Sequence, residues 1–183
     1  AQAYFEYDSK KSFGLTKSHL RFGKQPILAT YLVKQADFIA CHNQSYLRQY
    51  DMLSELKPGG IFLLNCGWQP EELAAQLPAE VKRALAQKAA RFYIIDANAI
   101  ARDIGLGDHN SMVLQAAFFA LADIIPLAQA VAQMKQAVAK TFRKKGEQVV
   151  TMNMAAIDRG VAGMRQIAVP AVWAEAWDPP VAP

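Results

Sequence analysis

Compact apolar runs, separated by polar and turn residues, are the clearest pattern in the first half of the chain. Three of them have the length of buried strands: residues 36–41 (ADFIAC), 61–65 (IFLLN) and 91–96 (RFYIID). An alternating aromatic run at 3–7 (AYFEY) predicts a further strand, and a short one is expected around 15–22. The chain therefore has several strands available for a sheet.

Amphipathic stretches lie between these strands. Apolar side chains spaced by three and four predict a helix over 42–56, and the KPGG sequence at 57–60 predicts a turn after it. Proline and two glutamates at 70–72 fit the first turn of a helix, and another helix is expected over 78–90. This order of elements indicates an α/β layered fold, with a mostly parallel or mixed central sheet flanked by helices.

The second half of the chain is mainly helical. Asn110 or Ser111 is expected to cap a long apolar helix that ends before Pro126. The helical stretches are expected over 97–104, 110–125, 127–142 and 149–165, the last as a helix or a strand–helix unit. The tail at 171–183 is expected to be extended, with exposed tryptophans. No repeat divides the sequence, so residues 1–183 are expected to form a single domain.

Composition and charge narrow the class of partner. The 183 residues are 52% hydrophobic and 20% charged, with a net charge of +4, which is typical of a globular protein. The basic residues cluster only at 10–11 and 143–145. This argues against a nucleic-acid partner and fits an anionic small molecule or an acidic protein surface. No apolar run approaches the ~20 residues of a membrane-spanning helix, so we expect no membrane contact and a cytoplasmic location.

Residues that often carry catalysis or bind metals are sparse. Cys41 and His42 are adjacent, but neighbours on a strand point to opposite faces, so they are not expected to act as a pair. His19, His42 and His109 are far apart in the sequence and form no metal motif. The GLGD sequence at 105–108 follows a predicted helix, whereas a phosphate-binding loop follows a strand. We therefore expect no catalytic residue, no metal ligand and two reduced thiols.

The basic opening of the chain is the strongest candidate for ligand binding. Glycine lets a backbone approach a phosphate, hydroxyls donate hydrogen bonds, and Lys or Arg neutralises the charge. The candidate contacts are Ser9, Lys10, Lys11, Ser12, Ser18, His19 and Arg21. The same composition also fits a solvated loop. A second basic cluster at 141–146 fits the end of a helix, where the dipole favours cations, better than it fits a ligand site.

A series of collinear motifs covers about residues 3–173. They are YFEYDSKKSFGLTKSHLRFGKQPI, ADFIACHNQSYLRQYDML, GGIFLLNCGWQPEEL, FYIIDA, IGLG, MVLQAAFF, KKGEQVVTMN and VPAVW. Together they resemble the gamma-type domain of pyruvate:ferredoxin (flavodoxin) oxidoreductases. The resemblance implies that the chain is one domain of a larger multidomain enzyme, which oxidatively decarboxylates pyruvate to acetyl-CoA.

The resemblance also implies the groups that the parent enzyme uses. It is expected to use thiamine diphosphate, Mg and [4Fe–4S] clusters, with coenzyme A as a substrate and ferredoxin or flavodoxin as the electron acceptor. The cofactors and the acceptor are expected on other domains of the same polypeptide, which is expected to form a homodimer. The two cysteines of this chain agree with the absence of a four-cysteine cluster. By itself the domain is expected to be non-catalytic, to bind no cofactor alone, and to supply assembly surface and part of the coenzyme A site.

Within the resemblance, the SKKS and SHLR segments at 9–12 and 18–21 are the expected contacts to coenzyme A. The sequence departs from the family at Phe13, where a glycine is usual, and phenylalanine avoids positive φ. The chain also begins without a methionine and without the Gly-rich strand–loop–helix that precedes AYF in the family. We therefore expect a truncated start and only part of the anion site.

Two other interpretations of the chain stay open. In the first, it is a stand-alone α/β module that binds a nucleotide or an acidic protein through the basic opening. The mild net charge and the incomplete phosphate loop count against this interpretation. In the second, it is a spacer or a dimer surface, with Trp173 and Trp177 packed on a neighbouring domain.

Overall fold

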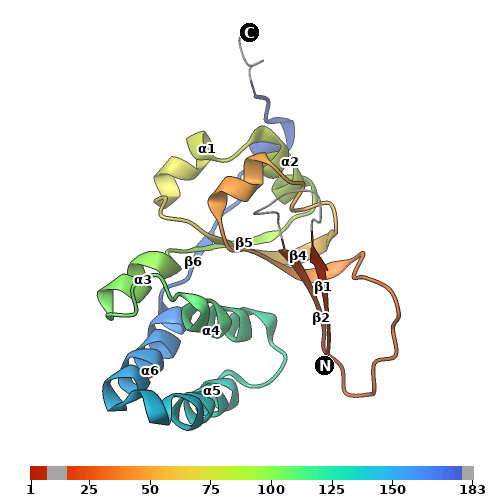
Figure 1. The fold of residues 1–183 in the computed structure, drawn as a ribbon. Coiled ribbons are helices and arrows are strands. Elements are labelled where there is room, and N and C mark those ends of the chain that lie inside the picture. The colour runs from red at the N-terminus through yellow and green to blue at the C-terminus, as the bar shows by residue number, and fades with distance from the viewer. Residues whose placement is uncertain (8–15, 179–183) are drawn as a thin grey trace.

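The main sheet has four strands with helices on both faces (Figure 1). A computed structural model describes residues 1–7 and 16–178 of the chain. The strands lie in the order β3 (Ala36–Cys41), β4 (Leu56–Asn65), β5 (Arg91–Ile95) and β6 (Arg165–Ile167). The first three run parallel, and β6 runs antiparallel to β5. The predicted α/β fold with a mixed sheet is confirmed.

The strands of this sheet are apolar on both sides because both sides are covered. On one face Phe62, Leu64 and Phe92 are buried, and the rings of Phe62 and Phe92 stack with centroids 5.7 Å apart. The elements near this face are the α-helices α1 (Leu73–Gln76) and α2 (Ala79–Gln87), and the 3-10 helices η1 (Gln44–Arg48), η2 (Pro70–Glu72) and η4 (Ala171–Glu175).

The opposite face carries the helices of the second half of the chain. Leu63 and Ile95 point to this side, since successive strand residues alternate between faces. The elements here are α3 (Ala97–Asp103), α4 (Ser111–Ala122), α5 (Leu127–Phe142), η3 (Arg143–Lys145) and α6 (Glu147–Ala162). Gly160 of α6 lies against α4, where an added Cβ would be 3.0 Å from the Ala116 Cβ. The missing side chain therefore lets the two helices approach closely.

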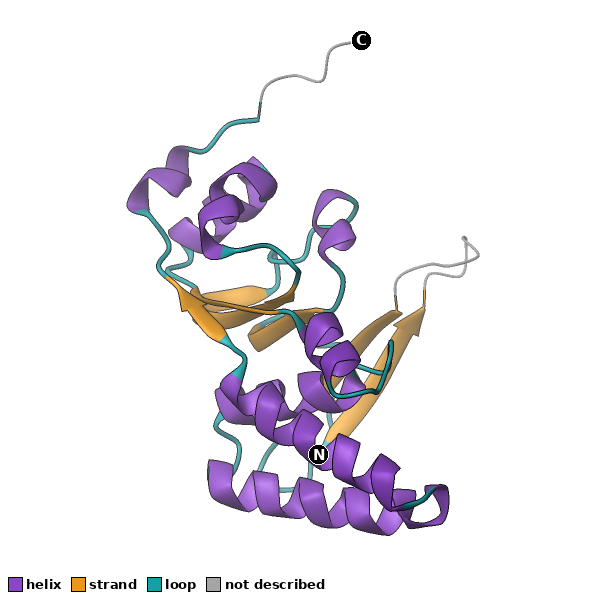
Figure 2. Ribbon diagram, turned by 90° about the vertical axis from the view of Figure 1, so that its left-hand side faces the viewer, coloured by secondary structure: helices purple, strands orange, loops and turns teal. Residues whose placement is uncertain are grey.

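A separate two-stranded ribbon precedes the sheet. Its strands β1 (Gln2–Tyr7) and β2 (Thr16–Arg21) lie where the sequence predicts strands. They pair antiparallel from Gln2↔Arg21 to Tyr7↔Thr16. The ribbon lies beside the main sheet and not within it (Figure 2). Residues 22–35 connect it to β3 without a helix or strand.

The predicted helix over 42–56 and the predicted turn at 57–60 are wrong. Only η1 forms in this stretch, and β4 already begins at Leu56. Asp51 explains the difference, because its Oδ1 accepts hydrogen bonds from the amides of Leu53 and Ser54 at 3.1 and 3.0 Å and so favours a turn. Lys88 then donates from Nζ to three carbonyls of the same stretch, those of Leu53, Ser54 and Leu56, each at 2.7 Å.

The tail differs from the expected extended segment over the residues that the structure describes. Residues 171–175 form η4, and Trp173 is buried against α2 with only 8% of its surface exposed. Asp178 accepts a hydrogen bond from the Ala79 amide at 2.8 Å, which satisfies a free N–H at the start of α2. Trp177 is 71% exposed, as expected. Residues 179–183 lie outside the described part.

Candidate functional site

A polar pocket lies at the carboxyl ends of β3, β4 and β5. Its volume is about 480 Å³. Each strand contributes the residues that follow its last apolar position, and α3 with the loop after it closes the other side. The lining residues are His42, Asn43, Gln44, Asn65, Cys66, Gly67, Asp96, Asn98, Arg102 and Asn110. Sequence reasoning did not identify this pocket.

Asn65 is the buried side chain that holds the pocket wall together. It is only 3% exposed. Its Nδ2 donates to the His42 carbonyl at 3.0 Å, and its Oδ1 accepts from the Ala97 amide at 2.9 Å. One side chain at the end of β4 therefore links the segment after β3 to the first turn of α3. The position of the pocket walls depends on these two hydrogen bonds.

The ionisable groups of the pocket do not form a nucleophilic centre. Burial raises the pKa of the Cys66 thiol, and it raises the pKa of the adjacent Cys41 thiol to about 11. Desolvation lowers the pKa of His42 below its ordinary value of 6.5. At neutral pH both thiols are protonated and the imidazole is uncharged. The Cys41 thiol hydrogen-bonds the Asn43 backbone carbonyl at 3.1 Å and not His42.

Residues 1–7 and 16–178 contain no group of three or more His, Cys, Asp or Glu side chains placed to hold a metal ion. Within the same residues, no helix is both long and apolar enough to cross a membrane. Both cysteines are free and buried.

The basic opening is only partly within the described residues. Ser9, Lys10, Lys11 and Ser12 lie outside them. β2 places Ser18 on the face of the ribbon opposite His19 and Arg21, because strand residues alternate. The three described candidates therefore do not share one ligand-facing surface.

His19 and Arg21 both make contacts within the chain. His19 is 4% exposed, and its Nδ1 accepts from the Val33 amide at 3.1 Å while its Nε2 lies 3.2 Å from Glu6 Oε2. Arg21 donates from Nη1 to Gln2 at 3.3 Å and lies over the Tyr31 ring, 4.9 Å from its centroid. These contacts join the ribbon to residues 22–35.

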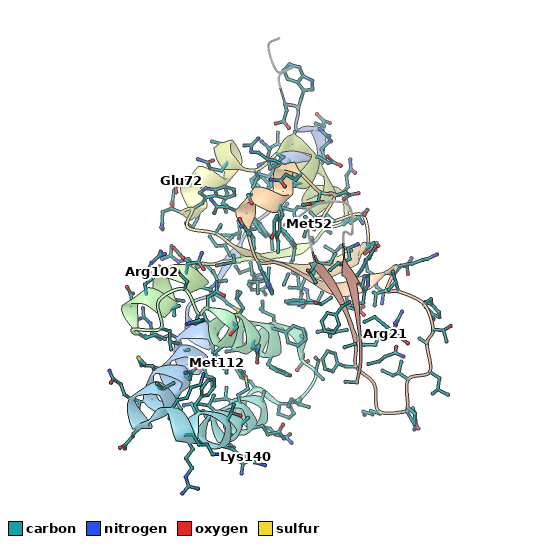
Figure 3. The ribbon with its side chains drawn as sticks, in the orientation of Figure 1. Arg21, Met52, Glu72, Arg102, Met112 and Lys140 are labelled. Carbon is teal, nitrogen blue, oxygen red and sulfur yellow. The ribbon has the colours of Figure 1, made fainter. Side chains whose placement is uncertain are left out.

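The ribbon and the pocket lie at different edges of the main sheet. Lys17, beside the ribbon end that leads into residues 8–15, binds Glu55 at 3.1 Å. Glu55 directly precedes β4, so this end of the ribbon lies at the amino end of that strand, whereas the pocket lies at its carboxyl end. Figure 3 shows Arg102 of the pocket and Arg21 of the ribbon on opposite sides of the molecule. Two separate polar regions are therefore present.

Comparisons with known proteins identify the family. The model of the pyruvate ferredoxin/flavodoxin oxidoreductase family matches residues 1–163. The chain is 52% identical to the pyruvate:ferredoxin oxidoreductase of Moorella thermoacetica over 178 residues, which are 97% of this chain and 15% of that protein. It is also 52% identical to the pyruvate-flavodoxin oxidoreductase of Klebsiella pneumoniae over 179 residues, 98% of this chain and 15% of that protein. The chain belongs to the pyruvate ferredoxin/flavodoxin oxidoreductase family.

A solved structure supports the fold of this family member. The PORC subunit of pyruvate oxidoreductase from Thermotoga maritima matches with a TM-score of 0.64 at 19% identity, covering 90% of this chain and 80% of that one. At this identity the match concerns the fold alone. The chain spans about 15% of the length of the curated relatives from Moorella and Klebsiella.

Proposed function

We propose that this chain is a domain of an enzyme that oxidatively decarboxylates pyruvate to acetyl-CoA and transfers the electrons to ferredoxin or flavodoxin in the cytoplasm. The observation that carries the proposal is the 52% identity to a pyruvate:ferredoxin oxidoreductase across 97% of the chain. The remainder of such an enzyme supplies the other domains that this one contacts, and the whole enzyme is a homodimer.

In this proposal the domain is non-catalytic and leaves the redox cofactors to other domains. A [4Fe–4S] cluster needs four cysteine thiolates, but the chain has two cysteines, both buried and with raised pKa values. These residues therefore do not fit a cluster. Thiamine diphosphate with its Mg, and the docking of ferredoxin or flavodoxin, are likewise assigned to other domains.

The basic opening is proposed to form one wall of the coenzyme A site. Ser9, Lys10, Lys11, Ser12 and Ser18 are the proposed contacts to the anionic substrate, because they combine hydroxyl donors with two cations. His19 and Arg21 belong to the same segment. Their internal contacts support a role in holding β2 in place.

The ribbon and the segment after it are proposed as assembly surface. Large apolar side chains are exposed there: Leu28 is 88%, Tyr31 65% and Phe5 58% exposed. Leu20 and Phe22 are also exposed, at 47% and 42%. A concentration of exposed apolar side chains is typical of a protein interface, and most of the length of the relatives lies outside this chain. The partner is therefore another part of the same polypeptide.

The coenzyme A role is tested in the full-length enzyme with Lys11→Ala. Loss of a charge-assisted contact is expected to raise the KM for coenzyme A by about tenfold or more, while the KM for pyruvate stays unchanged. Lys144→Ala, in the second basic cluster on η3, is the matched control and should alter neither constant. An unchanged KM for coenzyme A in Lys11→Ala would remove the basic opening from the site.

A further inference from the structure

The pocket at the carboxyl ends of β3, β4 and β5 has none of the roles proposed above. It lies where open α/β sheets generally bind ligands, just beyond the carboxyl ends of parallel strands. Its volume of about 480 Å³ falls within the range of small-molecule sites. The position and the size therefore both suit a small ligand.

Hydrogen bonds inside the protein fix which atoms of the pocket remain for a ligand. The Asn43 side-chain oxygen accepts from the Ser45 amide at 3.0 Å, and the Gln44 side-chain oxygen accepts from the Gly67 amide at 3.3 Å. Since both oxygens are engaged, the NH₂ groups of these two side chains are the ones left to donate. The segment after β3 thus offers two oriented donors.

The opposite wall supplies one cation and one carboxylate. Arg102 is exposed on α3, and among residues 1–7 and 16–178 its guanidinium has no hydrogen-bond or ion-pair partner. Asp96 uses Oδ1 to accept from the Ala99 amide at 2.8 Å, whereas Oδ2 faces Gly67, where an added Cβ would lie 3.4 Å from it. The carboxylate therefore keeps one oxygen for a hydroxyl donor of a ligand.

This set of groups matches one ligand chemistry. Guanidinium and amide donors bind the oxygens of a phosphate, and a carboxylate oxygen accepts from sugar hydroxyls. We propose that the pocket binds the phosphorylated ribose of a nucleotide, with Arg102, Asn43 and Gln44 on the phosphate and Asp96 on a ribose hydroxyl. The proposal does not rest on the role given to the basic opening.

Two sources supply this chemistry. One is the nucleotide portion of coenzyme A, and the other is a separate nucleotide such as ADP. The full-length enzyme distinguishes them by two measurements: calorimetric titration with ADP, and the KM for coenzyme A with and without ADP.

The test variants are Arg102→Ala and Asp96→Asn. Arg102 is exposed, so its removal leaves the core intact. Asparagine at 96 retains an oxygen that caps α3 and removes only the carboxylate charge. Arg143→Ala on η3, also exposed, is the matched control for loss of one arginine. Lys11→Ala is measured in parallel, so that failure of the basic-opening role and failure of the pocket are told apart.

Arg102→Ala is expected to weaken binding of the nucleotide by about tenfold, and Asp96→Asn by a smaller factor. The Arg143→Ala control should bind the nucleotide as the wild type does. If ADP binding weakens and the KM for coenzyme A does not change, the occupant is a separate nucleotide. If the KM for coenzyme A rises and ADP competes with coenzyme A, the occupant is coenzyme A. The proposal is overturned if Arg102→Ala changes both the ADP affinity and the KM for coenzyme A by less than about twofold. It is also overturned if the wild-type enzyme binds no ADP and Arg102→Ala leaves the KM for coenzyme A unchanged.

Discussion

Asn65, at the end of β4, connects the segment after β3 to the start of α3. It is one of three buried polar or charged side chains among the described residues, with His19 and Asn153. Both ends of its amide are used, one on the His42 carbonyl and one on the Ala97 amide. A buried backbone group that loses its partner costs about 1–3 kcal/mol, so the geometry of the pocket depends on this residue.

Asn65→Ala is therefore expected to loosen the start of α3. The Ala97 amide would lose its hydrogen-bond acceptor, and its hydrogen exchange in the full-length enzyme should accelerate by about tenfold or more. Mass spectrometry of peptides that cover 97–103 measures this. Asn98→Ala, which changes an exposed asparagine in the same pocket, should have little effect. Unchanged exchange in Asn65→Ala would show that the two hydrogen bonds contribute little.

The buried Cys41 thiol is expected to make the free energy of unfolding of the domain depend on pH. Its pKa is raised from 9.0 to about 11, mainly by burial. Above pH 9.0 an unfolded thiol releases its proton while the folded one keeps it, so the stabilisation is present below pH 9.0 and is lost as the pH rises through about 11. The expected loss is on the order of 1–3 kcal/mol.

Denaturant unfolding of this domain at pH 8 and pH 10 (roughly one pH unit below and above the ordinary thiol pKa of 9.0) measures that loss. Cys41→Ala is the control, and its stability should fall less over the same interval. The assignment to Cys41 fails if the variant and the wild type lose stability equally.

The short helix η4 is joined to α2 although about ninety residues separate them in the chain. Trp173 belongs to the core cluster that also contains Leu77, Val81 and Leu85. Arg83 donates to the Ala176 carbonyl, and Asp178 accepts from the start of α2. The last part of the described chain is therefore part of the domain core.

Trp173→Ala and Trp177→Ala form a matched pair that tests this arrangement. Removing the buried indole is expected to destabilise the domain by about 3–5 kcal/mol, because it leaves a large cavity. Removing Trp177, which is 71% exposed, should change the stability by less than about 0.5 kcal/mol. Thermal or denaturant unfolding of both variants gives the comparison, and equal losses would contradict the burial of Trp173.

Sequence patterns predict well those elements whose conformation is determined by residues that are close together in the chain. The apolar runs at 36–41, 61–65 and 91–96 correspond to parallel strands, and helices form before and after Pro126 as predicted. The stretch 42–56 has the spacing of a helix but is held by distant contacts. Lys88 binds its carbonyls from more than thirty residues away, and no local pattern reveals that.

The pocket also depends on contacts between residues that are far apart in the sequence. Its walls come from the ends of three strands and from α3, so they meet only after the sheet has formed. A signal was nevertheless present, since polar residues end or directly follow each of the three strands, at 42–44, 65 and 96. Because the carboxyl ends of parallel strands meet at one edge, this pattern would have located the pocket. The composition of the basic opening predicts a ligand site, but its described residues divide between two faces of the ribbon.

The proposed function concerns the activity of the enzyme that contains this domain. The most direct test is an assay of the purified full-length enzyme with pyruvate and coenzyme A, monitoring reduction of ferredoxin or flavodoxin together with formation of acetyl-CoA. The proposed function predicts electron transfer that requires both pyruvate and coenzyme A. Absence of pyruvate-dependent reduction, with activity on a different 2-oxoacid instead, would contradict it.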